Sequence, residues 1–149
     1  MKKILCYIIL SLLLINCTSL NNSKNDEIDL KELSEKLFKE YSFSYETLRK
    51  KSSTQLVVLK ISKENFSNND YEKIKKALLA DKWSLIDSYN NYYSFCKTND
   101  YSVDILNPIY SKHYSRDGDE VNFTSNDYWY FAFYYNKLGI NTCMEYYRN

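Results

Sequence analysis

Glycine, proline and histidine are scarce in this chain, which has two glycines, one proline and one histidine in 149 residues. Two glycines are too few for a glycine-rich phosphate loop, and neither a Gly-x-Ser-x-Gly elbow nor a Cys-x-x-Cys motif is present. No nucleophile, base and orienting group can be proposed together. The sequence therefore predicts no catalytic residue, no metal ligand, no cofactor and no enzyme.

An excess of positive charge is also lacking, because 20 Lys and Arg residues face 19 Asp and Glu residues. A protein that holds nucleic acid needs a basic surface to neutralise phosphates, so we expect no nucleic-acid partner. Tyrosine, by contrast, is abundant at 16 residues, and 12 of these follow residue 80.

The first 16 residues have the layout of a secretory signal peptide. Lys2 and Lys3 give a cationic start, and the apolar run from Ile4 to Ile15 contains no charge. This run is shorter than the about 20 apolar residues that a helix needs to cross a hydrocarbon core. We therefore expect residues 1–16 to direct export and then to be cleaved.

The residues around the expected cleavage point, Leu14-Ile15-Asn16-Cys17, resemble the lipobox of bacterial lipoproteins, which places an apolar residue three positions before the cysteine. The position directly before the cysteine usually holds Gly, Ala or Ser in this pattern, and here it holds Asn16. The resemblance covers only the leader and the first mature residue. It implies diacylglycerol on the Cys17 sulfur, cleavage before Cys17 and acylation of the new amine by a fatty acid such as palmitate. The implied partner is a lipid bilayer.

Thr18 follows the cysteine, where an aspartate would retain a lipoprotein in the inner membrane of enteric bacteria. By this resemblance we expect an outer-membrane lipoprotein that faces the periplasm. An inner-membrane anchor is one alternative. Two others are cleavage after Ser19, which would give a secreted protein, and retention of the leader. Loss of residues 1–16 removes two lysines and leaves 133 residues with a net charge of −1.

Two of the four cysteines are left to pair with each other in the mature chain. Cys6 leaves with the leader, and Cys17 is taken by lipid. Because exported compartments are oxidising, Cys96 and Cys143 are expected to form a disulfide. Two buried free thiols are the alternative.

Residues 17–26 are predominantly polar and are expected to form a flexible tether to a globular domain at residues 27–149. The domain begins with apolar residues at helical spacing over residues 27–41, a pattern that predicts a helix capped by Asp26 or Asp29. This helix is expected to pack on the core.

The next two elements are a strand and a second helix. Residues 55–62 are apolar on both faces over four positions, which predicts a central strand covered on both sides. The second helix is expected to begin after Ser67, with Asp70 completing a capping box and Phe66 packing on Tyr71. It ends near residues 81–82.

From residue 83 the apolar pattern has a period of two. It indicates strands at residues 83–89, 92–97, 101–105, 120–124, 128–135 and 140–147. Both paired cysteines are thus expected in strands. The sequence predicts a single small α+β domain, with an antiparallel sheet of about five to six strands packed by two helices on one face.

The predicted strand at residues 128–135 is aromatic on both faces. Its face with Trp129, Phe131, Phe133 and Tyr135 can lie in the core. The other face carries Tyr128, Tyr130 and Tyr134, whose rings combine a large apolar body with a polar tip that suits recognition. We consider these three tyrosines a speculative partner-binding surface, with a structural border to the core as the alternative.

The only histidine lies in a polar segment with other titratable residues, namely His113, Arg116, Asp117, Asp119 and Glu120. These types could form an acid–base cluster or a cation-binding turn. Their spacing does not match the alternate ligand positions of a calcium-binding loop. A solvated loop around a glycine turn is the simpler expectation.

The lipid anchor, the tether, the disulfide and the aromatic strand favour a non-enzymatic binding protein with a protein partner in the periplasm. One specific form is an immunity protein that neutralises an incoming toxin. An envelope-assembly or structural outer-membrane lipoprotein is the alternative. A third hypothesis is an enzyme that uses the loop around His113.

Overall fold

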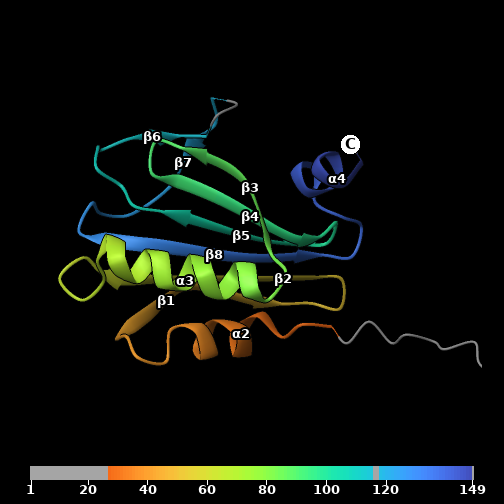
Figure 1. The fold of residues 1–149 in the computed structure, drawn as a ribbon, viewed down its shortest axis with the longest axis horizontal. Coiled ribbons are helices and arrows are strands. Elements are labelled where there is room, and N and C mark those ends of the chain that lie inside the picture. The colour runs from red at the N-terminus through yellow and green to blue at the C-terminus, as the bar shows by residue number, and fades with distance from the viewer. Residues whose placement is uncertain (1–26, 116–117, 149) are drawn as a thin grey trace, which may run out of the picture.

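Helices and strands make up most of the part of the chain that the structure describes, residues 27–115 and 118–148 of a computed structural model (Figure 1). The helices are α2 (Leu30–Leu37), α3 (Asn68–Ala80) and α4 (Asn141–Arg148). The strands are β1 (Phe43–Lys50), β2 (Thr54–Ser62), β3 (Ser84–Tyr89), β4 (Tyr92–Thr98), β5 (Tyr101–Leu106), β6 (His113–Tyr114), β7 (Glu120–Val121) and β8 (Tyr128–Asn136). Six strands form one antiparallel sheet, and β6 pairs with β7. The predicted α+β class is confirmed.

Strand β8 lies inside the sheet, whose order is β1-β2-β8-β5-β4-β3. It pairs along its whole length with β2 and over six residues with β5. A simple meander would have placed it at an edge. Its composition explains the interior position, because a strand that is aromatic on both faces gains most from neighbours on both sides.

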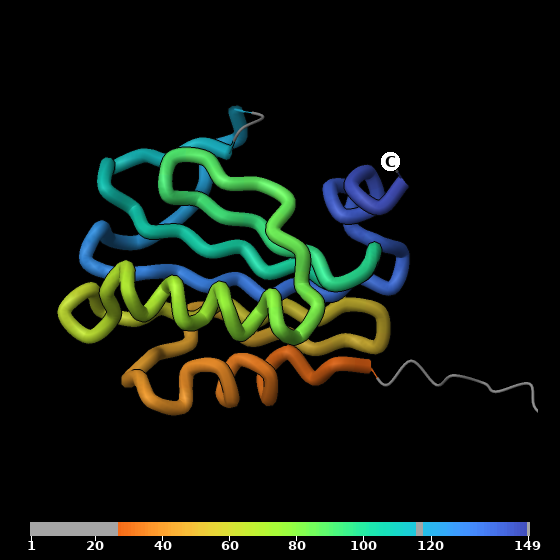
Figure 2. Tube along the Cα trace, viewed as in Figure 1, coloured from red at the N-terminus to blue at the C-terminus, as the bar shows by residue number. Residues whose placement is uncertain are grey.

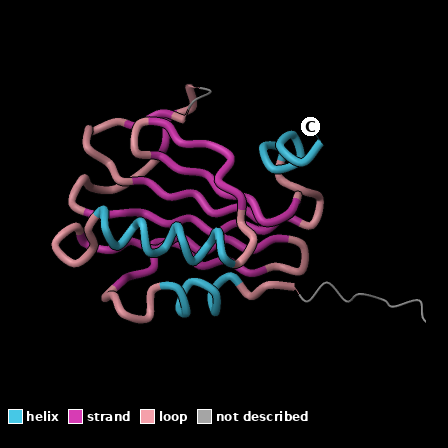
Figure 3. The backbone as a smooth tube through the Cα atoms, in the orientation of Figure 1, coloured by secondary structure: helices cyan, strands magenta, loops and turns pink. Residues whose placement is uncertain are grey.

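The core lies between one face of the sheet and the helices α2 and α3; in Figure 3, α3 lies in front of the strands and α2 lies below them. Strand β8 contributes Trp129, Phe131, Phe133 and Tyr135, each at most 8% exposed, and this confirms their predicted common face. Phe38, next to α2, packs on Phe131 with ring centroids 4.4 Å apart. Each large apolar side chain buried here contributes about 1.5–3 kcal/mol.

Both core helices begin where the sequence predicts a cap. Asp29 Oδ1 accepts the N–H groups of Lys31 and Glu32 at the start of α2. At α3, Ser67 Oγ accepts the Asp70 N–H, and the Asp70 carboxylate accepts the Ser67 N–H, which is the predicted capping box. A cap of this kind contributes about 0.5–2 kcal/mol.

Two features near the start of the domain differ from the sequence-based expectation. The first helix ends at Leu37 rather than at residue 41, and strand β1 was not predicted. Strand β1 lies at the edge of the sheet, and its register with β2 shifts between Tyr45 and Thr47. A bulge breaks the period of two, so the apolar alternation that identifies a strand is weak here.

The predicted last strand, residues 140–147, is wrong, because this segment forms helix α4. Cys143 is fully buried, and Tyr147 donates its hydroxyl to the Cys96 carbonyl at 3.0 Å. Residues four apart share one face of a helix, so the helical conformation brings both side chains to β4. The disulfide joins Cys96 to Cys143 with Cα atoms 5.6 Å apart, and it therefore links a strand to a helix rather than two strands.

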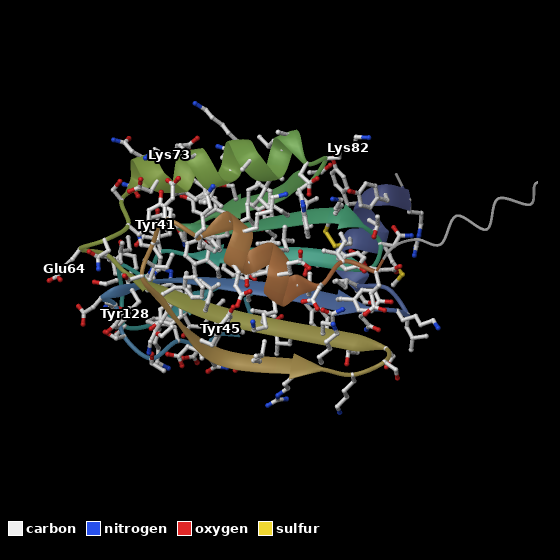
Figure 4. All side chains as sticks on the ribbon, turned by 90° about the horizontal axis from the view of Figure 1, so that it is seen from below. Tyr41, Tyr45, Glu64, Lys73, Lys82 and Tyr128 are labelled. Carbon is white, nitrogen blue, oxygen red and sulfur yellow. A yellow bond between two sulfur atoms is a disulfide. The ribbon has the colours of Figure 1, made fainter. Side chains whose placement is uncertain are left out.

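One end of the sheet, called the Glu27 end, has the first described residue and the turns that follow β1, β4 and β8 (Figure 2). Backbone hydrogen bonds join these turns. The Lys137 N–H donates to the Ser53 carbonyl at 2.9 Å, and the Ile140 N–H donates to the Asn99 carbonyl at 2.7 Å. The disulfide lies toward this end in Figure 4.

The opposite end, called the Asn90 end, has the β3–β4 turn and the segments 63–67, 107–115 and 118–127. Asn90 and Asn91 adopt positive φ angles of 46° and 61°, as in a two-residue hairpin turn, and the predicted turn is confirmed. The Asn107 N–H donates to the Asn91 carbonyl at 2.9 Å. This bond fixes the segment after β5 to the hairpin.

Candidate functional site

The predicted leader, the lipidated Cys17 and the tether lie outside the described residues, as do Asp26, Arg116 and Asp117. In the part of the chain that is described, no helix has the length and apolar character needed to cross a membrane. The same residues contain no group of three or more His, Cys, Asp or Glu side chains placed to hold a metal ion.

Tyr130 lies on the predicted outer face of β8, where its hydroxyl holds the backbone of a loop. Its side chain is only 7% exposed. The hydroxyl accepts the N–H groups of Thr124 and Ser125 at 3.2 and 2.9 Å and donates to the Ser125 carbonyl at 3.0 Å. A buried hydroxyl with all its bonds made inside the protein is a structural group.

Tyr128 and Tyr134 are half-buried on the same face of β8 as Tyr130. The Lys60 ammonium lies 4.9 Å from the centroid of the Tyr128 ring, and Lys60 also forms an ion pair with Glu46. Six residues along a strand span about 20 Å, so the two rings are far apart. The three tyrosines therefore do not form one continuous binding surface.

His113 is 2% exposed, so the expectation of a solvated loop is wrong at this residue. Its Nε2 accepts the backbone N–H groups of Ile109 and Tyr110 at 2.9 and 3.2 Å. Burial lowers the pKa of the imidazole, and a hydrogen bond with the Asn90 backbone opposes this effect. Because the Nε2 lone pair is occupied, His113 holds backbone and is not placed as a general base.

The segment 107–114, called the His113 loop, is fixed at several points besides its histidine. The Asn107 N–H binds the Asn91 carbonyl. The Lys63 ammonium donates to the Pro108 carbonyl, and burial lowers the pKa of this lysine. These bonds come from the residue that follows β2, from the β3–β4 hairpin and from the loop itself. The backbone of the His113 loop is thus held by three separate parts of the fold.

Large side chains project outward from this fixed loop. Ile109 is 52% exposed, Tyr110 63% and Tyr114 44%. Tyr89, on the hairpin that is bonded to the loop, is 42% exposed. The Tyr110 ring rests beside the buried His113 imidazole, with centroids 5.7 Å apart. These four exposed side chains are called the aromatic patch, and they are four of the nine exposed large hydrophobic residues in the described chain.

A hollow of about 290 Å³ lies beside the β6–β7 ladder and is lined by β3, β4 and β5. Asp104 lines the hollow and accepts a hydrogen bond from Ser94 Oγ at 2.7 Å. Burial raises the pKa of the Asp104 carboxyl, and hydrogen bonds from Ser94 and Tyr92 oppose this effect. Asp119 and Glu120 also line the hollow. Several carboxyl groups thus line this hollow, and that of Glu120 is paired with the Lys112 ammonium at 3.2 Å.

Comparisons with known proteins find no matching family model, no similar curated protein and no similar solved structure. The site is therefore interpreted from its geometry. Exposed aromatic side chains on a fixed backbone match the composition of the central part of protein–protein interfaces, where tyrosine is enriched.

Sequence reasoning named His113 but missed the side chains that it supports. The available signal was the run Pro108-Ile109-Tyr110, which is apolar within a polar segment. A sequence alone does not show whether such a run folds inward. The structure shows that its backbone is bonded to His113 while Ile109 and Tyr110 stay exposed.

Proposed function

We propose that this chain is an exported, lipid-anchored protein whose domain binds another protein through the aromatic patch. The patch itself is the observation that supports the proposal, because three large side chains are exposed on the hydrogen-bonded His113 loop and a fourth, Tyr89, is exposed on the hairpin bonded to that loop. A fixed loop loses little conformational freedom on binding, so more of its contact energy appears as affinity.

The anchor in this proposal is the lipidated Cys17, and its support is the leader followed by Leu14-Ile15-Asn16-Cys17. The bond between Cys96 and Cys143 is consistent with export to an oxidising compartment. An outer-membrane protein that faces the periplasm is the location that these features favour. Neutralisation of an incoming toxin is the specific role that an adjacent toxin gene would support. An assembly operon would instead support a role in building the envelope.

Site-specific photo-crosslinking in the native host tests the binding surface. A benzophenone amino acid replaces Tyr110 in the patch or Leu79 on α3, which is 45% exposed and serves as the matched control. We expect one discrete adduct from position 110 and none from position 79. Equal adduct patterns from both positions, or none at position 110, would contradict the proposal.

Substitution then measures the contribution of the patch to affinity for the captured protein. Tyr110→Ser is expected to weaken binding about 30-fold or more, because aromatic side chains at interface centres commonly contribute 2 kcal/mol or more. Leu79→Ser should leave the dissociation constant unchanged. Both residues are exposed, so circular dichroism should report the same folded content for the two variants.

A further inference from the structure

Leu138 is the most exposed of the large hydrophobic residues in the described chain, at 86%. It lies at the tip of the turn between β8 and α4, at the Glu27 end. Nothing in the described residues covers it. An isolated exposed leucine is ordinary on a protein surface, so its meaning depends on how the turn is held and where this end of the molecule lies.

The turn that presents Leu138 has a fixed backbone. The Leu138 N–H donates to Asn136 Oδ1 at 3.0 Å, and the Gly139 N–H donates to the Asn136 carbonyl at 2.8 Å. Gly139 has a φ of 91°, and a Cβ there would lie 2.5 Å from Met144 Sδ. Bonds from Lys137 and from the residue after Gly139 tie the turn to its neighbours. Leu138 is thus held outward by the fold.

The chain leaves the described domain at the same end. The Ile28 N–H donates to the Tyr101 hydroxyl at 3.0 Å, which places the start of the domain beside the β4–β5 turn. Nine residues separate Cys17 from Glu27. An extended chain spans at most about 3.6 Å per residue, so the ten steps between these two residues reach at most about 36 Å.

The Asn90 end is farther from that attachment point. Strand β8 has nine residues, and a strand of this length is about 30 Å long. A lipid on Cys17 therefore lets Leu138 touch the bilayer with the tether slack, whereas the aromatic patch can touch it only when most of the tether's length is extended.

Charges at the Glu27 end do not oppose contact with a bilayer. Lys51 and Lys137 are exposed on the turns beside Leu138, and Glu27 and Asp100 lie at the same end. Lys97 also lies at this end, where it is paired with Asp81 at 2.7 Å. These charges nearly balance, so contact is expected with zwitterionic lipid and does not need an anionic surface.

We propose that the 136–139 turn rests in the headgroup region of the anchoring bilayer, with Leu138 as the inserted side chain. This inference rests on the proposed lipid anchor at Cys17. One leucine would not recruit a free domain to a membrane, but a tether raises the local concentration so far that a small contact decides orientation. In this orientation the strands run roughly perpendicular to the membrane surface, and the aromatic patch lies at the end of the domain that faces away from the bilayer.

Fluorescence quenching tests the contact with the full lipidated protein in vesicles of phosphatidylcholine or of its brominated analogue. Leu138→Trp reports on the turn, and Tyr110→Trp at the Asn90 end is the matched control, since both positions are exposed. The natural Trp83 and Trp129 are each 2% exposed and provide a common background. We expect brominated lipid to quench the added emission at position 138 at least twofold more than at position 110.

Equal quenching at the two positions, in protein that floats with the vesicles, would overturn this orientation while leaving the anchor intact. Protein that does not float with the vesicles would contradict the anchor, and the orientation would fall with it. The two failures are therefore distinguishable by flotation alone. Preferential quenching at position 138 in floating protein supports the inference.

Discussion

Acidification is expected to destabilise the domain through His113, the residue that holds the backbone of the His113 loop. Burial lowers the pKa of its imidazole below the usual value of 6.5. The neutral ring accepts two backbone N–H groups, and a protonated Nε2 could accept neither. The stabilisation is therefore complete above the unfolded pKa and is lost as the pH falls from about 6.5 toward the folded pKa.

The magnitude follows from proton linkage. If the folded ring stays neutral while the unfolded ring titrates near 6.5, the free energy of unfolding falls by up to about 1.4 kcal/mol between pH 7.5 and 5.5. His113→Gln offers a carbonyl oxygen as acceptor and does not titrate. We expect the variant to be less stable at pH 7.5 by about 1–3 kcal/mol, because an imperfect acceptor leaves buried N–H groups poorly bonded.

The assay is urea unfolding followed by tryptophan fluorescence, since Trp83 and Trp129 are buried reporters. Other groups also titrate in this range, including Asp104, whose pKa is raised by burial. Their contributions cancel in the difference between the natural protein and His113→Gln. The natural protein should lose more stability on acidification than the variant. Parallel pH profiles for the two proteins would refute the role assigned to His113.

Two further predictions concern stability. Replacement of both Cys96 and Cys143 by alanine should lower the free energy of unfolding by about 4 kcal/mol on the chain-entropy model, for a sequence separation of 47 residues. Chemical denaturation measures this, and a loss below about 1 kcal/mol would show that the bridge does not restrain the unfolded chain. Tyr130→Phe should lower stability by about 2 kcal/mol, because the Thr124–Ser125 backbone loses its bonds to the hydroxyl. Tyr134→Phe is the matched control and should change thermal stability little. An equal loss of stability in the two variants would contradict the structural role of the Tyr130 hydroxyl.

Local patterns predicted the parts of the fold that depend on neighbouring residues. The capping box of Ser67 and Asp70, the turn at Asn90 and the alternation of the aromatic β8 are each contained within a few residues. The α+β class followed from the order of these elements. Helix α4 did not follow, because its conformation is decided by the burial of Cys143 against a distant strand. Tertiary packing there overrides a weak local preference.

The candidate site could be predicted only in part for the same reason. His113 is distinctive as the single histidine, but its burial depends on the backbone of the loop that it holds. Exposure of Tyr110 is likewise a property of the folded loop. Tyr130, unlike Tyr110, is buried, because the loop at residues 122–127 covers this part of the predicted outer face. The sequence pattern indicates which residues share a face of a strand, but only the folded structure shows which of these faces are exposed to solvent.

Both proposals depend on the anchor, and mass spectrometry of the mature N-terminus tests it most directly. We expect protein purified from its native membrane to begin at Cys17, with diacylglycerol on the sulfur and an acyl chain on the amine. The 16 preceding residues should be absent. A mature chain that retains the leader, begins after Ser19, or has an unmodified Cys17 would contradict the account.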